Sequence, residues 1–103
     1  MLTTINMNKI IINLNKVWGK SSFFNLLKDE LAFPDYFGNN WDAADECIRD
    51  LCWLDSGTTI CFRNAEKLRS RNSSLYDEII LFIRENQEYW ETETANKIRI
   101  VIE

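Results

Sequence analysis

Hydrophobic residues form two kinds of pattern along the chain. Three short, mostly apolar runs, residues 9–14, 58–62 and 97–102, are rich in isoleucine, valine, threonine and phenylalanine. Runs of this length and composition are too short for helices and favour β-strands. The first run contains three consecutive isoleucines and is too apolar for an exposed strand, so it is predicted to be a buried strand of a parallel sheet.

A first helix is predicted between the first two strands. Ser21 and Ser22 offer N-caps, because a serine hydroxyl can accept a hydrogen bond from a free amide of the first turn. The apolar residues that follow with helical spacing are Phe23, Phe24, Leu26, Leu27 and Leu31. The helix must end before Phe33, since Pro34 pushes the preceding residue out of the helical region.

Residues 34–40 are predicted to form a loop, and residues 41–52 a second helix. Proline, glycine and asparagine favour turns, and Asn39 or Asn40 can cap the helix. The apolar stripe of the helix is Ala44, Cys47, Ile48 and Leu51. Its charged residues at i, i+3, i+4 and i+7 are predicted to share the opposite face: Asp42, Asp45, Glu46 and Arg49.

Two more helices are predicted before the last strand. One is short, over residues 65–69, and one is long, capped by Ser73 and Ser74. The apolar face of the long helix is Leu75, Ile79, Phe82 and Ile83. Strands separated by helices are typical of right-handed crossovers within a parallel sheet. We therefore predict one α/β domain over residues 1–103, a small three-stranded parallel sheet packed with three to four helices.

The composition excludes several kinds of catalytic and metal site. The chain has no histidine, so Ser–His and Cys–His nucleophiles, HExxH zinc sites and histidine acid–base catalysis are impossible. Its three glycines form no GxGxxG or Walker loop, and its three cysteines form no CxxC pair. We expect no metal and no cofactor. The odd number of cysteines and the lack of a secretory signal favour a reducing cytoplasm, and no apolar run approaches the ~20 residues of a membrane span.

Charge is distributed unevenly along the chain. The formal net charge is −4, but residues 29–55 carry eight acidic residues and one arginine, a net charge of −7. One interpretation of such a run is a solvated helix face. The other is a surface that attracts a basic partner and raises its association rate. Direct binding to nucleic acid is disfavoured, because the phosphates would be repelled.

The acidic region also contains a specific motif. Residues 33–43, which read FPDYFGNNWDA, and residues 45–47, DEC, resemble the family of barstar, the intracellular inhibitor of the ribonuclease barnase. The order of predicted elements is similar to that family along nearly the whole chain. The resemblance implies an immunity protein, not an enzyme, that is a monomer when free. Its loop and second helix would plug the active site of a ribonuclease or nuclease toxin domain in a 1:1 complex.

The resemblance also implies a set of partner-binding residues. Tyr36 matches the contact tyrosine of the family, Gly38 the loop glycine and Asn40 the helix-capping asparagine. Trp41 stands where the family has an aliphatic contact residue. Asp42 matches an interface aspartate.

Three further positions on the two longer helices complete the set. Glu46 replaces the dominant aspartate of the family, which moves the carboxylate one methylene further out. Glu85 matches a peripheral glutamate on the last long helix. Asp45 departs from the family pattern, because it replaces an interface tryptophan. The segment that carries Tyr89 and Trp90 also looks longer than in the family, so the partner surface can differ.

The chemistry of these residues suits inhibition of a nuclease. A ribonuclease active site is cationic because it holds a phosphate, and carboxylates can occupy the same place. Asp42 and Glu46 project from one helix face about one turn apart, and Tyr36 and Trp41 can act as aromatic anchors. Each residue also has a simpler interpretation. Asp42 can favour the helix dipole, Glu46 can form a surface ion pair, and the two aromatic residues can belong to the core.

Two competing functions follow from the same residues. Two carboxylates could act as the acid and base of a glycoside hydrolase, but i, i+4 acids on an exposed helix are common and no arginines or glycines shape a pocket around them. The second alternative keeps the barstar-like fold as a binding module for a different basic partner, either a toxin that is not a ribonuclease or a regulatory target.

Overall fold

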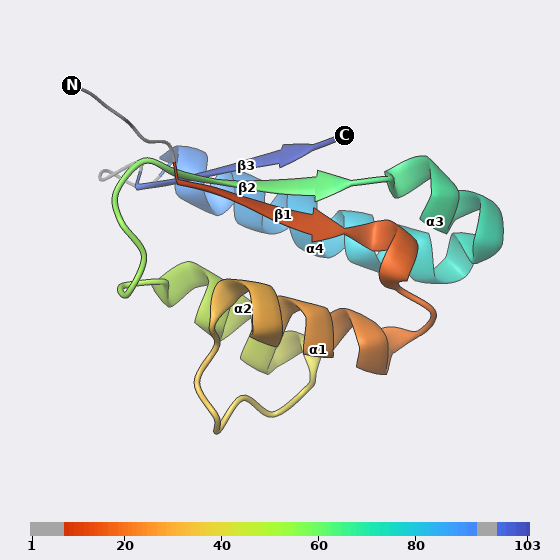
Figure 1. Ribbon diagram of the computed structural model, residues 1–103, viewed down its shortest axis with the longest axis horizontal. Coiled ribbons are helices and arrows are strands. Elements are labelled where there is room, and N and C mark those ends of the chain that lie inside the picture. Colours follow the sequence, from red (N-terminus) through yellow and green to blue (C-terminus); the bar gives the residue numbers. More distant parts are fainter. Residues whose placement is uncertain (1–7, 93–96) are drawn as a thin grey trace.

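The computed structural model describes residues 8–92 and 97–103. Strands and helices follow one another in the predicted order, which confirms the α/β class (Figure 1). In chain order the elements are β1 (Lys9–Asn13), the 3-10 turn η1 (Leu14–Lys16), α1 (Lys20–Leu31), α2 (Trp41–Asp50), β2 (Thr58–Arg63), α3 (Ala65–Arg71), α4 (Ser73–Thr92) and β3 (Ile98–Ile102). Across the described residues, none of these helices combines the length and the apolar character that a membrane span requires.

The three strands form one parallel sheet with β2 at its centre. Parallel neighbours need long crossover connections, and here α1 and α2 connect β1 to β2, while α3 and α4 connect β2 to β3. The register aligns two apolar rows on one face, Ile10 with Ile60 and Ile100, and Ile12 with Phe62 and Ile102. The helices pack against these two rows.

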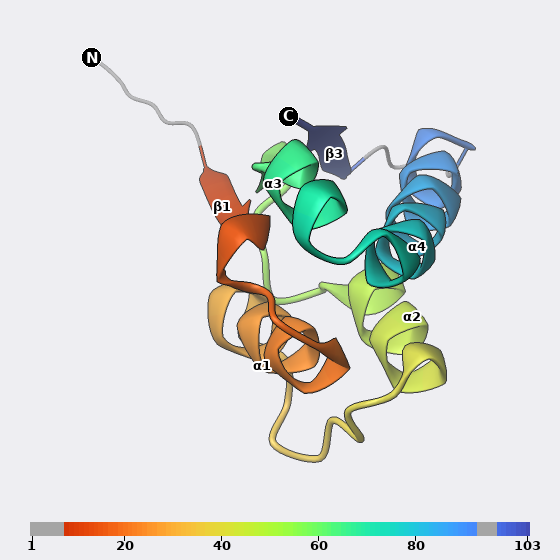
Figure 2. The same cartoon turned by 90° about the vertical axis from the view of Figure 1, so that its right-hand side faces the viewer.

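Among the described residues, the helices cover one face of the sheet. In both ribbon views α1, α2 and α4 lie on the same side of the sheet (Figures 1 and 2). Ile12 and Phe62 on that side have no exposed surface, whereas Ile11 and Val101 on the other face are half-buried and flank the fully buried Cys61. Parallel sheets are usually covered on both faces. The prediction of a buried first strand is therefore correct for one face only.

The start of α1 differs from the prediction. Gly19 takes the N-cap position, and Ser22 lies in the third position of the helix. The hydroxyl of Ser22 accepts hydrogen bonds from the amides of Trp18, at 2.8 Å, and Gly19, at 3.0 Å. Ser22 is thus the N3 residue of a capping box, whose side chain bonds to the backbone amide of the N-cap residue, and it is not itself the N-cap.

The start of α4 also differs from the prediction. The side-chain oxygen of Asn72 accepts a hydrogen bond from the amide of Leu75 at 3.1 Å. Asn72 therefore caps α4, and the two serines predicted for this role, Ser73 and Ser74, lie in the first turn. The apolar face is as predicted, since all four of its members are buried: Leu75, Ile79, Phe82 and Ile83.

Two truncations in β1 test the one-sided packing. Ile12→Ala removes a fully buried side chain, so we expect the free energy of unfolding to fall by about 2–5 kcal/mol. Ile11→Ala is the matched control, because it removes the same atoms from the adjacent, half-buried position, and we expect less than half of that loss. Urea denaturation measures both values, and equal losses would contradict the one-sided arrangement.

Candidate functional site

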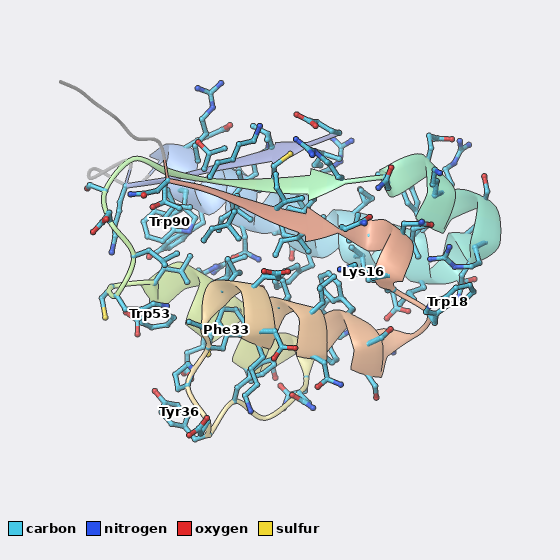
Figure 3. All side chains as sticks on the ribbon, in the orientation of Figure 1. Lys16, Trp18, Phe33, Tyr36, Trp53 and Trp90 are labelled. Carbon is cyan, nitrogen blue, oxygen red and sulfur yellow. The ribbon has the colours of Figure 1, made fainter. Side chains whose placement is uncertain are left out.

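The loop at residues 32–40 is held by two buried phenylalanines. Ala32 ends α1 with a left-handed φ of 56°, and the carbonyl of Pro34 accepts a hydrogen bond from the amide of Phe37 at 2.9 Å. The rings of Phe33 and Phe37 are both buried, with their centroids 5.1 Å apart. Tyr36, between them in the chain, is 81% exposed and lies at the outer end of the loop (Figure 3). The buried rings of Phe33 and Phe37 thus hold the loop in place, and the ring of Tyr36 is exposed to solvent.

Asn40 links this loop to α2. Its side-chain oxygen accepts a hydrogen bond from the amide of Ala43 at 2.8 Å, and its side-chain nitrogen donates to the carbonyl of Gly38 at 3.2 Å. A Cβ atom on Gly38 would lie 3.1 Å from that nitrogen, so a larger residue there would push the amide of Asn40 back by a few tenths of an ångström. Asn39, like Ala32 at the start of the loop, is left-handed, with φ of 51°. Asn40 and Gly38 therefore fix the loop relative to the first turn of α2.

Asp42 and Glu46 are exposed on α2. They stand four residues apart and so project from one side of the helix about one turn apart. Glu46 and Tyr36 line one hollow of about 390 Å³, which we call the loop hollow. Its lining residues are Pro34, Tyr36, Glu46, Cys47, Arg49 and Asp50. The structure thus brings together a tyrosine and a carboxylate that the sequence placed ten residues apart.

Asp45 and Arg49 both form hydrogen bonds with α4, where Asn86 has no exposed surface. The amide nitrogen of Asn86 donates to Asp45 at 2.9 Å, and its oxygen accepts from Nε of Arg49 at 2.7 Å. The guanidinium of Arg49 also lies 4.9 Å from the ring centre of Tyr89. Of the four residues predicted to share the exposed face of α2, Asp42, Glu46 and Arg49 are exposed, whereas Asp45 is half-buried against α4.

Asn86 is a residue that the sequence reasoning missed. It occupies a polar position within the apolar stripe of α4 (Ile79, Phe82, Ile83 and Trp90), and that break in the pattern was the available signal. Its side-chain nitrogen also donates a hydrogen bond to the carbonyl of Phe82 at 2.9 Å, so both the nitrogen and the oxygen of this amide are hydrogen-bonded. A buried amide that is fully hydrogen-bonded fixes the relative position of two helices.

Trp41 is part of the core as well as the site. Its half-buried ring packs against Phe24 at 5.0 Å, Phe82 at 5.4 Å and Phe23 at 5.8 Å between centroids. The cluster joins α1, α2 and α4. Trp41 therefore holds α2 against α1 and α4, and only part of its side chain is exposed to solvent.

Trp90 also belongs to the core. It is 6% exposed, and its indole nitrogen donates to the carbonyl of Ile48 at 2.9 Å. It thus tethers the last turn of α2 to α4. Residues 93–94, which complete the longer segment noted in the sequence, lie outside the described residues.

A second hollow, of about 220 Å³, lies between α2 and α4. We call it the α2–α4 hollow, and its lining residues are Trp41, Asp45, Glu78, Leu81, Phe82 and Glu85. Three of these, Trp41, Asp45 and Glu85, are residues that the sequence resemblance assigned to partner binding. The structure thus joins Glu85 on α4 to the site on α2, although the two are about forty residues apart in the chain.

Cys47 lines the loop hollow beside the carboxylates of α2. Burial, together with the neighbouring carboxylates of Glu46 and Asp50, raises the pKa of the Cys47 thiol. A raised pKa keeps this cysteine in the unreactive thiol form at neutral pH. Among the described residues, no group of three or more acidic or cysteine side chains is arranged to hold a metal ion.

Comparisons with known proteins identify the family. The family model described as Barstar (barnase inhibitor) matches residues 7–103. The chain belongs to the barstar family. A protein of Bacillus subtilis (strain 168), named "Putative ribonuclease inhibitor YrdF", is 34% identical over 97 residues, which is 94% of this chain and 100% of that protein. The resemblance inferred from residues 33–43 is therefore confirmed.

The barstar-family motif maps onto one continuous part of the fold. Residues 33–43 span the loop and the first turn of α2, and residues 45–47 continue along that helix. Members of the barstar family are inhibitors of ribonucleases. The structure shows that the motif combines buried residues that fix the loop, such as Phe33 and Phe37, with exposed residues such as Tyr36 and Asp42.

The role of Asn86 can be tested by truncation. Asn86→Ala leaves the partly buried groups of Asp45 and Arg49 without their shared amide, so we expect the free energy of unfolding to fall by about 1–3 kcal/mol. Arg84→Ala, at an exposed position of the same helix, is the control, with an expected change within about 0.5 kcal/mol. Chemical denaturation measures both, and a loss no larger than that of the control would show that the amide does not hold the helices.

Proposed function

We propose that this protein inhibits a ribonuclease by covering its cationic active site with the loop at residues 32–40 and helix α2, together called the loop–helix surface. The family match supports an inhibitor of a ribonuclease, and the related Bacillus subtilis protein carries a ribonuclease inhibitor's name. The proposed complex contains one copy of each protein. The inhibitor itself catalyses nothing.

One observation carries this proposal. Asp42 and Glu46 are both exposed, one turn apart, on a helix that is fixed at both ends, and the exposed ring of Tyr36 lies beside Glu46. A ribonuclease stabilises negative charge on a phosphate with arginine, lysine or protonated histidine. Two carboxylates on a rigid helix can take the place of that phosphate, and the tyrosine can supply an aromatic contact beside them.

The charge around the site supports the same partner. The segment from residue 29 to residue 55 has a net charge of −7, and it contains the whole loop–helix surface. A field of this sign accelerates the approach of a basic protein and repels RNA, so we propose that the protein contacts the enzyme and not its nucleic-acid substrate. The three unpaired cysteines favour a reducing cytoplasm as the place of action.

Inhibition is tested directly with a panel of ribonucleases that includes barnase. A fluorogenic RNA substrate measures cleavage while the purified protein is added in increasing amounts. We expect one enzyme to lose activity in proportion to the protein added, with the end point at one inhibitor per enzyme. If every ribonuclease keeps its full activity, the proposal is wrong. Capture of a basic protein of another class would then identify a barstar-like binding module with a different target. The departure from the family pattern at Asp45 is consistent with such a change of target.

The carboxylates can be tested by neutral replacement. Asp42→Asn with Glu46→Gln keeps the shape of the surface and removes two charges, so we expect the dissociation constant for the inhibited ribonuclease to rise about a thousandfold, since truncating one close charge pair typically costs roughly 2–5 kcal/mol. Binding kinetics by surface plasmon resonance measure the change, mostly in the dissociation rate.

The matched control lies in the same acidic segment. Asp29→Asn with Glu30→Gln removes two charges from exposed positions at the end of α1. We expect this pair to lower only the association rate, by less than about tenfold, and to lose its effect at high salt. Equal effects of the two pairs would mean that the acidic surface acts only at long range. Unfolding curves of both variants show that the fold is unchanged.

A further inference from the structure

Arg49 is the one basic residue in the acidic segment, residues 29–55. It lies in the last turn of α2, its side chain is exposed, and it lines the loop hollow together with Tyr36 and Glu46. The last turn suits any cation, because of the helix dipole. A positive charge at this place nevertheless weakens the attraction between the acidic segment and a cationic enzyme.

Two contacts from α4 fix the guanidinium of Arg49. Its Nε donates a hydrogen bond to the side-chain oxygen of Asn86 at 2.7 Å, and Asn86 has no exposed surface. The guanidinium carbon also lies 4.9 Å from the ring centre of Tyr89, within the range of a cation–π contact. A long side chain that is already ordered loses less entropy when it binds a partner. Arg49 is therefore prepared for a contact that needs a defined position.

Within the part of the chain that the structure describes, no carboxylate neutralises Arg49. The ion pairs there are Lys20 with Glu78, Arg63 with Glu103, and Arg69 with Glu66. Asp45, one turn before Arg49 on the helix, accepts its hydrogen bond from Asn86 instead. Only Nε of Arg49 is hydrogen-bonded among the described residues, so its two terminal nitrogens can form parallel hydrogen bonds with one carboxylate.

The charges around Arg49 favour an acidic side chain of a protein as its partner. Glu46 and Asp50 line the same hollow, so the hollow holds two carboxylates and one guanidinium. An RNA strand would bring only further negative charge to it. A protein can bring one carboxylate for Arg49 together with cations for Glu46 and Asp50.

We propose that Arg49 pairs with a carboxylate that the bound ribonuclease carries beside its cationic active site. The inference deepens the proposed function and rests on it for the nature of the partner. The carboxylate would meet the terminal nitrogens of Arg49 in the loop hollow, while neighbouring cations of the enzyme meet Glu46. Charges of alternating sign across an interface fix its register, because a shifted arrangement brings like charges together.

The pairing makes Arg49 a specificity residue. Asp42 and Glu46 are exposed and match any cationic active site, so they discriminate little among ribonucleases. A ribonuclease with lysine or arginine opposite Arg49 would place like charges together, and interfaces reject wrong partners in this way. Because α4 holds the guanidinium, Arg49 cannot easily turn away from such a charge. Tight binding then requires an acidic residue at one place on the enzyme.

Neutral replacement tests Arg49 by the sign of its effect. Arg49→Gln makes the protein more negative, so a role only at long range predicts faster association with a basic ribonuclease and tighter binding. We expect the opposite: the dissociation constant for the inhibited ribonuclease rises about tenfold or more, mostly through faster dissociation. Surface plasmon resonance measures both rates, and unchanged or tighter binding would overturn the proposal.

The matched control is Arg84→Gln. It removes the same charge from an exposed position of α4 that lines neither the loop hollow nor the α2–α4 hollow. We expect its dissociation constant to stay within a factor of about three of the wild-type value. Equal weakening by Arg49→Gln and Arg84→Gln would contradict a local pairing.

A double-mutant cycle separates pairing from a structural role. Arg49 also helps to hold α2 on α4, so its loss could weaken binding by loosening the helix. Each aspartate or glutamate near the active site of the inhibited ribonuclease is replaced by its amide, and its binding to the wild-type protein and to Arg49→Gln is compared. We expect one replacement to couple with Arg49 by about fivefold or more, whereas a loosened helix would weaken binding of all the enzyme variants equally. Coupling with none of them would overturn the proposal.

The outcomes distinguish this inference from the proposed function. If a ribonuclease is inhibited equally by the wild-type protein and by Arg49→Gln, the inference is wrong and the proposed function stands. If no ribonuclease in the panel is inhibited, the proposed function is wrong, and the claim of a ribonuclease carboxylate falls with it. Weaker inhibition by Arg49→Gln, together with coupling to one carboxylate of the enzyme, supports both.

Discussion

The packing of α2 against α4 is the contact on which the whole acidic surface depends. Helices α1, α2 and α4 pack on the same face of the sheet, and α2 contacts α4 (Figure 2). Three kinds of contact hold it there: the ring of Trp41 on Phe82, the amide of Asn86 with Asp45 and Arg49, and the indole of Trp90 on the carbonyl of Ile48. Apolar packing supplies the attraction, and the amide and the indole fix the position along the helix.

The packing of α2 against α4 is opposed by electrostatic repulsion among the carboxylates of α2. The ten residues of α2 contain four carboxylates and one arginine. Asp42 in the first turn and Arg49 in the last are placed favourably for the helix dipole, which offsets part of the repulsion by roughly 0.3–1 kcal/mol each. Under the proposed function a cationic partner would relieve the remaining repulsion, while the core contacts keep the carboxylates in place beforehand. A surface that is ordered before binding loses less entropy on association.

Much of the fold followed from local patterns, and the differences have local causes. Apolar runs predicted the three strands, helical spacing predicted α1, α2 and α4, and Pro34 and Asn40 placed the loop and the start of α2, whereas the 3-10 turn η1 was not predicted. The end of α1 before Phe33 is as predicted, but α2 ends at Asp50 and not at residue 52, because Leu51 adopts the left-handed conformation without glycine. Leu51 has no exposed surface, so its burial outweighs the preference of its backbone.

The site was predicted by the motif, but its geometry was not. Spacing along one helix placed Asp42, Asp45, Glu46 and Arg49 on a common face, and only the position of α4 decides that two of them, Asp45 and Arg49, form hydrogen bonds with Asn86. Asn86 is 37 and 41 residues away from them in the chain, so no local pattern could connect them. Contacts of this kind are tertiary, and they override what helical periodicity alone implies.

The replacement at position 45 changes how the surface can distinguish its partners. The sequence resemblance implies a tryptophan at this position of the family, a large side chain that can protrude into a partner, whereas Asp45 is short and accepts a hydrogen bond from Asn86. Asp45 also lines the α2–α4 hollow. Affinity from exposed carboxylates is general, because any phosphate-binding site offers cations. Shape and charge combined in a recess are selective, because they require one side chain at one place. Under the proposed function, the short carboxylate at position 45 therefore changes which ribonuclease the surface fits, while Asp42 and Glu46 keep the same role.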